Sequence, residues 1–176
     1  ISMVTSIFAG FISYLDKSLS ADYLVIPQSI ILGQGNVAAG PRLAAEIRHA
    51  PGIAAVSSLR ITQGKVEGTA VQVIGIDPQK YPVISGLEFS TGDPAAAFTA
   101  LGNERAMIIN GIFSTASGIK VGDRVTLDTP SGAQEYRVVG IAMDYLNAKL
   151  ATGYISQANM EKDFHVTTDV LLMANS

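Results

Sequence analysis

The side chains that could carry out chemistry are few in this chain and far apart. His49 and His165 are the only histidines, and neither has an HxH or HxxxH partner nearby. Metal ligation requires several donors that converge, so this spacing argues against a metal site, and His49 is expected to stabilise the C-terminal end of a helix instead. The chain contains no cysteine, which excludes disulfides, thiolate zinc sites and cysteine nucleophiles.

Hydroxyl and carboxylate groups are not spaced for catalysis either. No G-x-S-x-G elbow supports a serine triad at Ser57, Ser58, Ser114 or Ser117. The carboxylates are sparse and show no spacing that requires a glycosidase-type pair; they are Glu46, Glu67, Asp77, Glu88, Asp93 and Glu104. The adjacent Glu104 and Arg105 are interpreted as a solvated turn pair. We therefore predict no catalytic, cofactor-binding or metal-ligating residue and no cofactor, while residues that contact a substrate or partner stay unassigned.

One glycine-rich segment, GQGNVAAG at residues 33–40, contains G-x-G-x-x-A before an expected helix. A dinucleotide fingerprint needs a strand that leads directly into its first glycine and an acidic residue about 20 positions later. Here the strand YLVI ends at Pro27, and the next strand, IAAVSSLRIT, contains no Asp or Glu. A loop that leaves the sheet is the preferred interpretation. Because a P-loop motif is also missing, the chain is expected neither to bind nor to hydrolyse ATP.

Composition limits the classes of protein to which the chain can belong. Its 176 residues suit one medium domain or two small subdomains. The composition is 48% hydrophobic and 15% charged, against a charged fraction of roughly 25% in ordinary soluble domains. Net charge is -3 and no Lys/Arg cluster exists, so a nucleic-acid partner is not expected. The chain starts at Ile1 and runs into apolar sequence, which we interpret as a piece of a longer protein.

The first 19 residues have the pattern of a helix with one apolar side. Met3, Ile7, Phe11 and Leu15 recur at four-residue steps, and polar residues lie towards the other side. Asp16 interrupts the segment before it reaches the roughly 20 apolar residues of a membrane span. The segment is interpreted as the outer end of such a span, and an amphipathic helix lying on a sheet is the alternative.

The rest of the chain alternates helix and strand patterns, which predicts an α+β fold. A DYLVIP strand is expected in a central position in a sheet. Strands at residues 53–63 and 66–77 are expected to join near Gly64, and a loop is expected at residues 78–86. The best-specified segment is a hairpin at residues 118–145, with turns at Gly122 and at residues 128–132. Further helices are expected at 41–49, after Asp93, at 112–117 and at 157–164, and further strands at 106–110, 153–156 and 169–174.

Short motifs follow one another along the chain in a recognisable order. Residues 73–78 read V-x-G-x-D-P, 86–89 read G-x-x-F, 121–125 read V-G-x-x-V, 138–141 read V-V-G-I, and 154–156 read Y-I-S. Preceded by an apolar helix and an ADYLVI strand, this order resembles the extracytoplasmic core domain of ABC-transporter permeases of the macrolide-exporter (MacB-type) and FtsX-like class. Each motif alone contains only residues that turns and strands commonly use. The feature specific to the family is the order of the motifs along nearly the whole chain.

The resemblance implies a two-lobed α+β fold, a MacB-like periplasmic core domain in which a mixed sheet with helices carries a smaller β-rich inserted lobe. The break at residues 78–86 divides the chain in this expectation. The principal lobe would combine residues 1–85 and 146–176, with the helix at 1–19 continuing from a transmembrane span. The inserted lobe would be residues 86–145, which contain the hairpin.

The resemblance also implies a function. Such a domain is not an enzyme; it lies on the extracytoplasmic side of a cell membrane and couples ATP hydrolysis on a separate cytoplasmic ABC ATPase to export or to an extracytoplasmic partner by transmitting motion. Its expected partners are the rest of the permease with its membrane helices, that ATPase, an adaptor or substrate protein outside the membrane, and a second copy in a dimeric transporter. A module that binds a lipid, peptide or drug between two lobes is the alternative, followed by a free-standing soluble domain or enzyme.

Overall fold

The computed structural model describes residues 23–25, 49, 51–84, 87–143, 150–169 and 171–175 of the chain. Their strands form one 9-stranded mixed sheet in the order β1-β9-β2-β3-β8-β5-β7-β4, and β6 pairs with both β2 and β7. The strands are β1 (Tyr23–Val25), β2 (Ala55–Val66), β3 (Thr69–Ile76), β4 (Glu88–Thr91), β5 (Ala106–Ile109), β6 (Arg124–Thr129), β7 (Gly132–Met143), β8 (Thr152–Ser156) and β9 (Leu171–Asn175). The helices are α4 (Tyr81–Ile84), α5 (Pro94–Asn103), α6 (Gly111–Ser117), α7 (Gln157–Asn159) and the π-helix η1 (Met160–Phe164). This mixture confirms the predicted α+β class.

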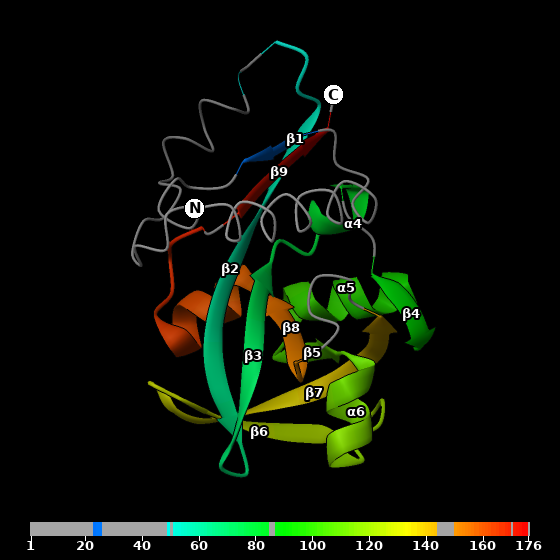
Figure 1. Cartoon of the computed structure of the whole chain (residues 1–176), viewed down its shortest axis with the longest axis vertical. Coiled ribbons are helices and arrows are strands. Elements are labelled where there is room, and N and C mark those ends of the chain that lie inside the picture. Colours follow the sequence, from blue (N-terminus) through cyan, green and yellow to red (C-terminus); the bar gives the residue numbers. More distant parts are fainter. Residues whose placement is uncertain are drawn as a thin grey trace, which may run out of the picture.

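The strand β2 connects two distant parts of the sheet. It pairs with β9 over residues 55–59, with β3 over residues 59–66, and with β6 at Lys65. At a rise of about 3.3 Å per residue, its 12 residues span roughly 40 Å. Figure 1 shows β9 at one end of β2 and, at the other end, the β2–β3 turn with the β6–β7 hairpin beside it.

Apolar side chains cover both faces of the sheet. Because successive residues of a strand point to opposite faces, the neighbours Val73 and Ile74 belong to different buried clusters. The cluster around Ile74 also contains Ile108 and Tyr154, together with residues of α4 and α5. The cluster around Val73 contains residues of α6, η1 and the β6–β7 hairpin. The helices therefore lie on both sides of the sheet, with a buried apolar layer under each.

Several caps and turns lie where the sequence predicts them. The carboxylate of Asp93 accepts the Ala96 N–H at 2.7 Å and caps α5. In the predicted hairpin, φ is 98° at Gly122 and 93° at Gly132, angles that residues with a Cβ adopt only with strain. These turns bound a hairpin in which β6 and β7 pair in register along the whole of β6.

Three local predictions are wrong. The β2–β3 turn is at Glu67 and Gly68, where φ is 50° and 81°, and not at Gly64. Gly64 lies inside β2, where it pairs with Val71 of β3 and the Phe164 ring packs 3.4 Å from the position of an added Cβ. The predicted loop at 78–86 contains the short helix α4. In the described part of the sheet, β1 lies at the end of the strand order and not at its centre, since apolar composition indicates covered faces and does not fix the number of neighbouring strands.

The predicted division into two lobes is not confirmed. The sheet runs through strands of both predicted lobes, since β8 pairs with β3 on one side and with β5 on the other. The cluster around Ile74 likewise draws residues from both. The predicted helices at 1–19 and 41–49 and the glycine-rich segment at 33–40 lie outside the described residues, except for His49. Of the helices that are described, none is long and apolar enough to cross a membrane.

Candidate functional site

The residues that the sequence singled out for possible chemistry are dispersed in the structure. His49 lies in an exposed turn, and His165 ends η1. The hydroxyls of Ser114 and Ser117 donate to main-chain carbonyl groups within and just after α6, and that of Ser58 accepts from Gln157. In the described parts of the chain, no group of three or more histidine and carboxylate side chains is placed to hold a metal ion.

The carboxylates considered at the outset have separate local roles. Asp77 accepts main-chain N–H groups in the turn after β3 and forms an ion pair with Lys80 at 3.1 Å. Asp93 caps α5, Glu67 lies in the β2–β3 turn, and Glu88 lies on β4. Glu46 is outside the described residues. The described carboxylates of this set therefore do not form a catalytic pair.

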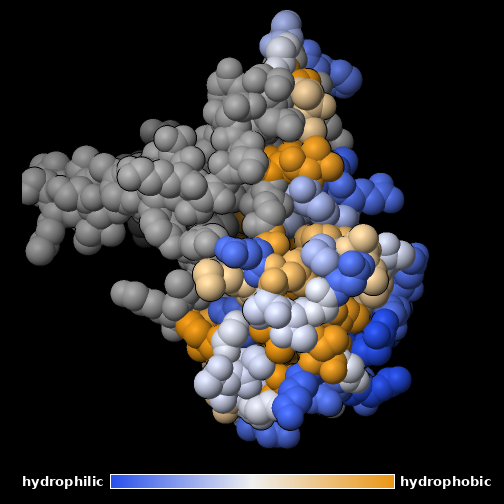
Figure 2. All heavy atoms as spheres, turned by 90° about the vertical axis from the view of Figure 1, so that its right-hand side faces the viewer, coloured by the Kyte–Doolittle hydropathy of each residue, from blue (hydrophilic) through white to orange (hydrophobic). Residues whose placement is uncertain are grey.

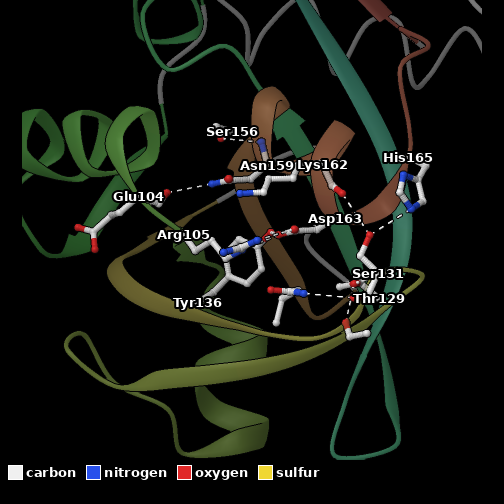
Figure 3. A network of polar contacts seen from close by, with 12 residues as sticks. Glu104, Arg105, Thr129, Ser131, Tyr136, Ser156, Asn159, Lys162, Asp163 and His165 are labelled. Atoms are coloured by element: carbon white, nitrogen blue, oxygen red, sulfur yellow. Dashed lines mark hydrogen bonds and ion pairs between the residues drawn. The ribbon is translucent and has the colours of Figure 1, made fainter.

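A buried carboxylate, Asp163, is the centre of a polar cluster that the sequence did not single out. Its carboxylate is on η1 and only 1% exposed. Arg105 donates to it through two guanidinium nitrogens, each at 2.9 Å, and the hydroxyl of Tyr136 donates to it at 2.5 Å. Figure 3 shows the three side chains converging from η1, from the residue before β5 and from β7. We call these three residues the Asp163 cluster.

The charges of the Asp163 cluster are fixed near neutral pH. The Arg105 guanidinium lowers the pKa of Asp163 despite the burial of the carboxylate. Burial, together with the hydrogen bond to Asp163, raises the pKa of Tyr136 well above its ordinary value. Asp163 is therefore a carboxylate, Tyr136 a neutral phenol and Arg105 a cation, and none has a pKa near 7 as a general acid or base requires. The arrangement holds elements together and has no group poised to transfer a proton.

A glycine on the sheet allows η1 to lie close to it. A Cβ at Gly75 of β3 would lie 2.7 Å from the sulfur of Met160, so a larger residue there would force that side chain to shift. Phe164 packs over Gly64 of β2 at ordinary contact distance, 3.4 Å from an added Cβ, and the side chains of Met160 and Phe164 are both buried. The preceding helix α7 is capped by Ser156, whose hydroxyl accepts the Asn159 N–H at 3.1 Å. The direction of this segment is thus set by its cap and by packing against the β2–β3 hairpin.

The turn of the β6–β7 hairpin is attached to the C-terminal end of η1. The main-chain N–H of Ser131 donates to the Asp163 carbonyl at 3.3 Å, and its hydroxyl donates to the Lys162 carbonyl at 3.2 Å. The same hydroxyl lies 3.1 Å from His165 Nε2. At the other end, the amide of Asn159 donates to the Glu104 carbonyl at 2.9 Å. The π-helix therefore joins the hairpin turn to the start of β5 (Figure 3).

The interpretation of Glu104 and Arg105 as a pair is wrong. Glu104 forms its ion pair with Arg137 on β7, and Arg105 forms its own with Asp163, a residue 58 positions away in sequence. Adjacent residues that leave a helix in extended conformation point their side chains in different directions, so each finds a partner on a different element. The alternation of β7 places Tyr136 on the buried side, but nothing local in the sequence indicates Asp163 as its acceptor.

A groove lies between α5 and the turn after β3. It has a volume of about 250 Å³ and is lined by Pro78, Gln79, Phe98, Thr99, Gly102 and Asn103. Sites for drug-sized ligands usually have roughly 300–1,000 Å³ and enclose most of the ligand, so this open groove is small for one. Figure 2 shows the side of the molecule that carries α5, β4 and α6, where hydrophobic and hydrophilic residues are interspersed.

Comparison with known proteins gives a match to one family and to solved structures. The family model described as "MacB-like periplasmic core domain" matches residues 1–176. The extracellular domain of the noncanonic ABC-type transporter YknZ from Gram-positive bacteria is 14% identical, with a TM-score of 0.63, over 90% of this chain and 81% of that one. The periplasmic region of MacB from Actinobacillus actinomycetemcomitans is 14% identical, with a TM-score of 0.54, over 76% of this chain and 63% of that one. At these identities the two structures establish similarity of fold, and no curated protein sequence matches.

Proposed function

The chain belongs to the family of MacB-like periplasmic core domains, and from this premise we propose that it is the non-catalytic extracytoplasmic domain of an ABC-transporter permease that transmits motion. In this proposal the ATPase is a separate cytoplasmic domain, and the motion it drives reaches the extracytoplasmic side through the membrane helices of the permease. A second copy of the domain and an adaptor or substrate protein outside the membrane are the further partners. The membership agrees with the resemblance found from the order of motifs.

The observation that carries the proposal is the continuity of β2. The strand joins β9, the last strand of the chain, to the hairpin turns at the far end of the sheet through main-chain hydrogen bonds. A movement applied at β9 therefore has a direct path to the β2–β3 turn. Backbone ladders of this kind resist stretching and sliding, since either change breaks several hydrogen bonds at once.

The Asp163 cluster supports the same role. It ties η1 to the start of β5 and to β7 by an ion pair and a hydrogen bond to the buried Asp163 carboxylate. Side-chain contacts therefore hold the β6–β7 hairpin in place in addition to its strand pairing. The Asp163 carboxylate accepts from both Arg105 and Tyr136, and the main-chain carbonyl of Asp163 accepts from Ser131. Groups that are paired in this way stiffen a fold, whereas a catalytic group needs a face that is open to substrate.

The proposal can be tested without knowing what the transporter moves. A fluorophore is placed at Thr69, an exposed residue at the start of β3, in the full-length transporter in vesicles that contain an acceptor lipid. Adding ATP is expected to change energy transfer to the lipid, and ADP serves as the control. A second label at Pro51, exposed just before β2, is expected to respond together with the first. No response at either position while ATP is hydrolysed would contradict the proposal.

The substrate-binding alternative predicts a different result. A module that binds a lipid, peptide or drug should bind it as the isolated chain, and the groove beside α5 is one described position where a ligand could lie. Substituting Phe98, which lines the groove, should then reduce binding. Saturable binding by the isolated chain that Phe98→Ala abolishes would favour this alternative over transmission.

A further inference from the structure

A second ionic cluster, separate from the Asp163 cluster, lies where the last segment of the chain crosses β2. Arg60 of β2 donates through Nε to Asp169 at 2.9 Å, and its terminal nitrogen lies 3.7 Å from a carboxylate oxygen of Glu161 on η1. The side chains of Arg60 and Asp169 are 16% and 11% exposed, whereas that of Glu161 is 61% exposed. The pair of Arg60 and Asp169 is thus largely shielded from water, and Glu161 contributes from the surface.

The position of Arg60 along β2 gives this pair its significance. The described pairs of the β2–β9 ladder run from Ala55 opposite Asn175 to Leu59 opposite Leu171, and Arg60 is the next residue of β2. Asp169 precedes β9 by two residues, and Glu161 belongs to the π-helix that leads to it. One guanidinium therefore joins β2, the π-helix and the chain that leads into β9, directly beside the described main-chain pairs of β2 with β9.

From this arrangement we infer that Arg60 is a positioning residue for transmission: it makes β9 and η1 move with β2. The inference rests on the proposed function. A movement that enters through β9 can pass into β2 only while the two strands stay in register, and a short ladder frays first at its end. The Arg60–Asp169 pair adds a side-chain link between β2 and the chain leading into β9, next to the described ladder. The planar guanidinium presents nitrogens in two directions, so it reaches Asp169 and Glu161 together, which an ammonium group does less well.

The test uses the full-length transporter with the fluorophore at Thr69. The fluorophore is introduced as a non-canonical amino acid, so that cysteines can be used for a disulfide cross-link. Arg60→Ala is expected to reduce the ATP-driven change in energy transfer roughly fivefold or more, which is the lower end of typical coupling between distant sites, while ATP hydrolysis continues. Arg124→Ala is the matched control. It removes an exposed arginine from a pair with Glu135 that lies within one hairpin, and it should leave the response unchanged.

A cross-link separates loss of coupling from loss of folding. Ser57 and Met173 are directly opposite each other in the antiparallel ladder, where Cα atoms lie roughly 4.5–5.5 Å apart, within the range that a disulfide spans. Ser57 suits the exchange because its hydroxyl is buried without a hydrogen-bond partner among the described residues, and the chain has no native cysteine. Adding Ser57→Cys and Met173→Cys to Arg60→Ala is expected to restore the response when oxidised and to lose it again when reduced.

The outcomes distinguish the inference from the function on which it rests. If the unsubstituted transporter gives no ATP-driven change at Thr69, the proposed function fails, and the inference fails with it. If that transporter responds and Arg60→Ala responds equally, the inference alone is overturned. A response that Arg60→Ala reduces and oxidation does not restore would also overturn it, because the defect would then lie outside the β2–β9 junction.

Discussion

Asp163→Asn should destabilise the folded chain through loss of one charge, with almost no change in side-chain volume. The carboxylate is 1% exposed and accepts from both Arg105 and Tyr136. Breaking a buried ion pair typically costs about 3–5 kcal/mol, but Arg105 is 33% exposed and can regain water, so the expected loss is smaller. We expect about 2–3 kcal/mol in the free energy of unfolding, which corresponds to a fall of roughly 4–12 °C in Tm for a chain of this size.

The assay is urea denaturation of the isolated chain at several pH values, with Asp128→Asn as the control. Asp128 is an exposed residue of β6, and its substitution should change the free energy of unfolding by less than about 0.5 kcal/mol. Because the pKa of Asp163 is lowered in the folded state, its stabilising contribution is present above the unfolded pKa, near 4, and is lost as pH falls through the folded value. The difference between the wild type and Asp163→Asn should therefore shrink at acid pH. A difference below about 0.5 kcal/mol at pH 7, or one that does not shrink in acid, would refute the account of this ion pair.

Three further predictions concern backbone strain, the buried hydroxyl and nucleotides. Gly122→Val should lower the free energy of unfolding by about 1 kcal/mol or more because φ is 98° there. Gly102→Ala, in a helix with open space around the added Cβ, should leave the free energy of unfolding unchanged or raise it slightly. Thermal unfolding compares the two variants, and equal effects would contradict the strain argument. Tyr136→Phe should lower the free energy of unfolding, measured by urea denaturation, by about 1–2 kcal/mol, since Asp163 loses one hydrogen-bond donor and keeps Arg105. An unchanged denaturation midpoint would show that the hydroxyl contributes nothing to stability. Calorimetry of the isolated chain with ATP should detect no specific binding at micromolar concentration, because the sequence has no P-loop, and saturable heat would instead support an enzyme.

Local chemistry in the sequence predicted the parts of the fold that depend on neighbouring residues. The alternation of β6 and β7 and the turns at Gly122 and Gly132 follow from side-chain direction and from the backbone angles that glycine permits. Asp93 before Pro94 predicted the start of α5 for the same kind of reason. The order of the motifs identified the family because turns and strands recur at matching places along the chain.

The sequence did not predict features that depend on residues far apart. Gly64 was predicted as part of a turn, yet it lies within β2, where it pairs with Val71 of β3 and Phe164, 100 positions later, packs over it. The segment 157–164 has a helical pattern, but periodicity does not distinguish an α-helix from the π-helix that directs Asp163 inward. Arg105 and Asp163 are separated by 58 positions, so only the folded sheet brings them together. The strand order also depends on residues far apart in the sequence. The predicted central position of β1 therefore does not match the described strand order, and the predicted two-lobed division is not confirmed.

The most direct test of the central claim is the distance between Pro51 and Thr69 in the working transporter. The two exposed residues flank the β2 strand and the turn that follows it, so a pair of spin labels there reports whether the sheet keeps its length. Pulsed electron spin resonance would compare the ATP-bound and ADP-bound states of the full-length protein. If the domain transmits motion as a stiff unit, the distance distribution stays the same in both states while the Thr69 label moves relative to the membrane. A shift of several ångströms between Pro51 and Thr69 during the ATP cycle would show that the sheet itself deforms and would contradict the claim.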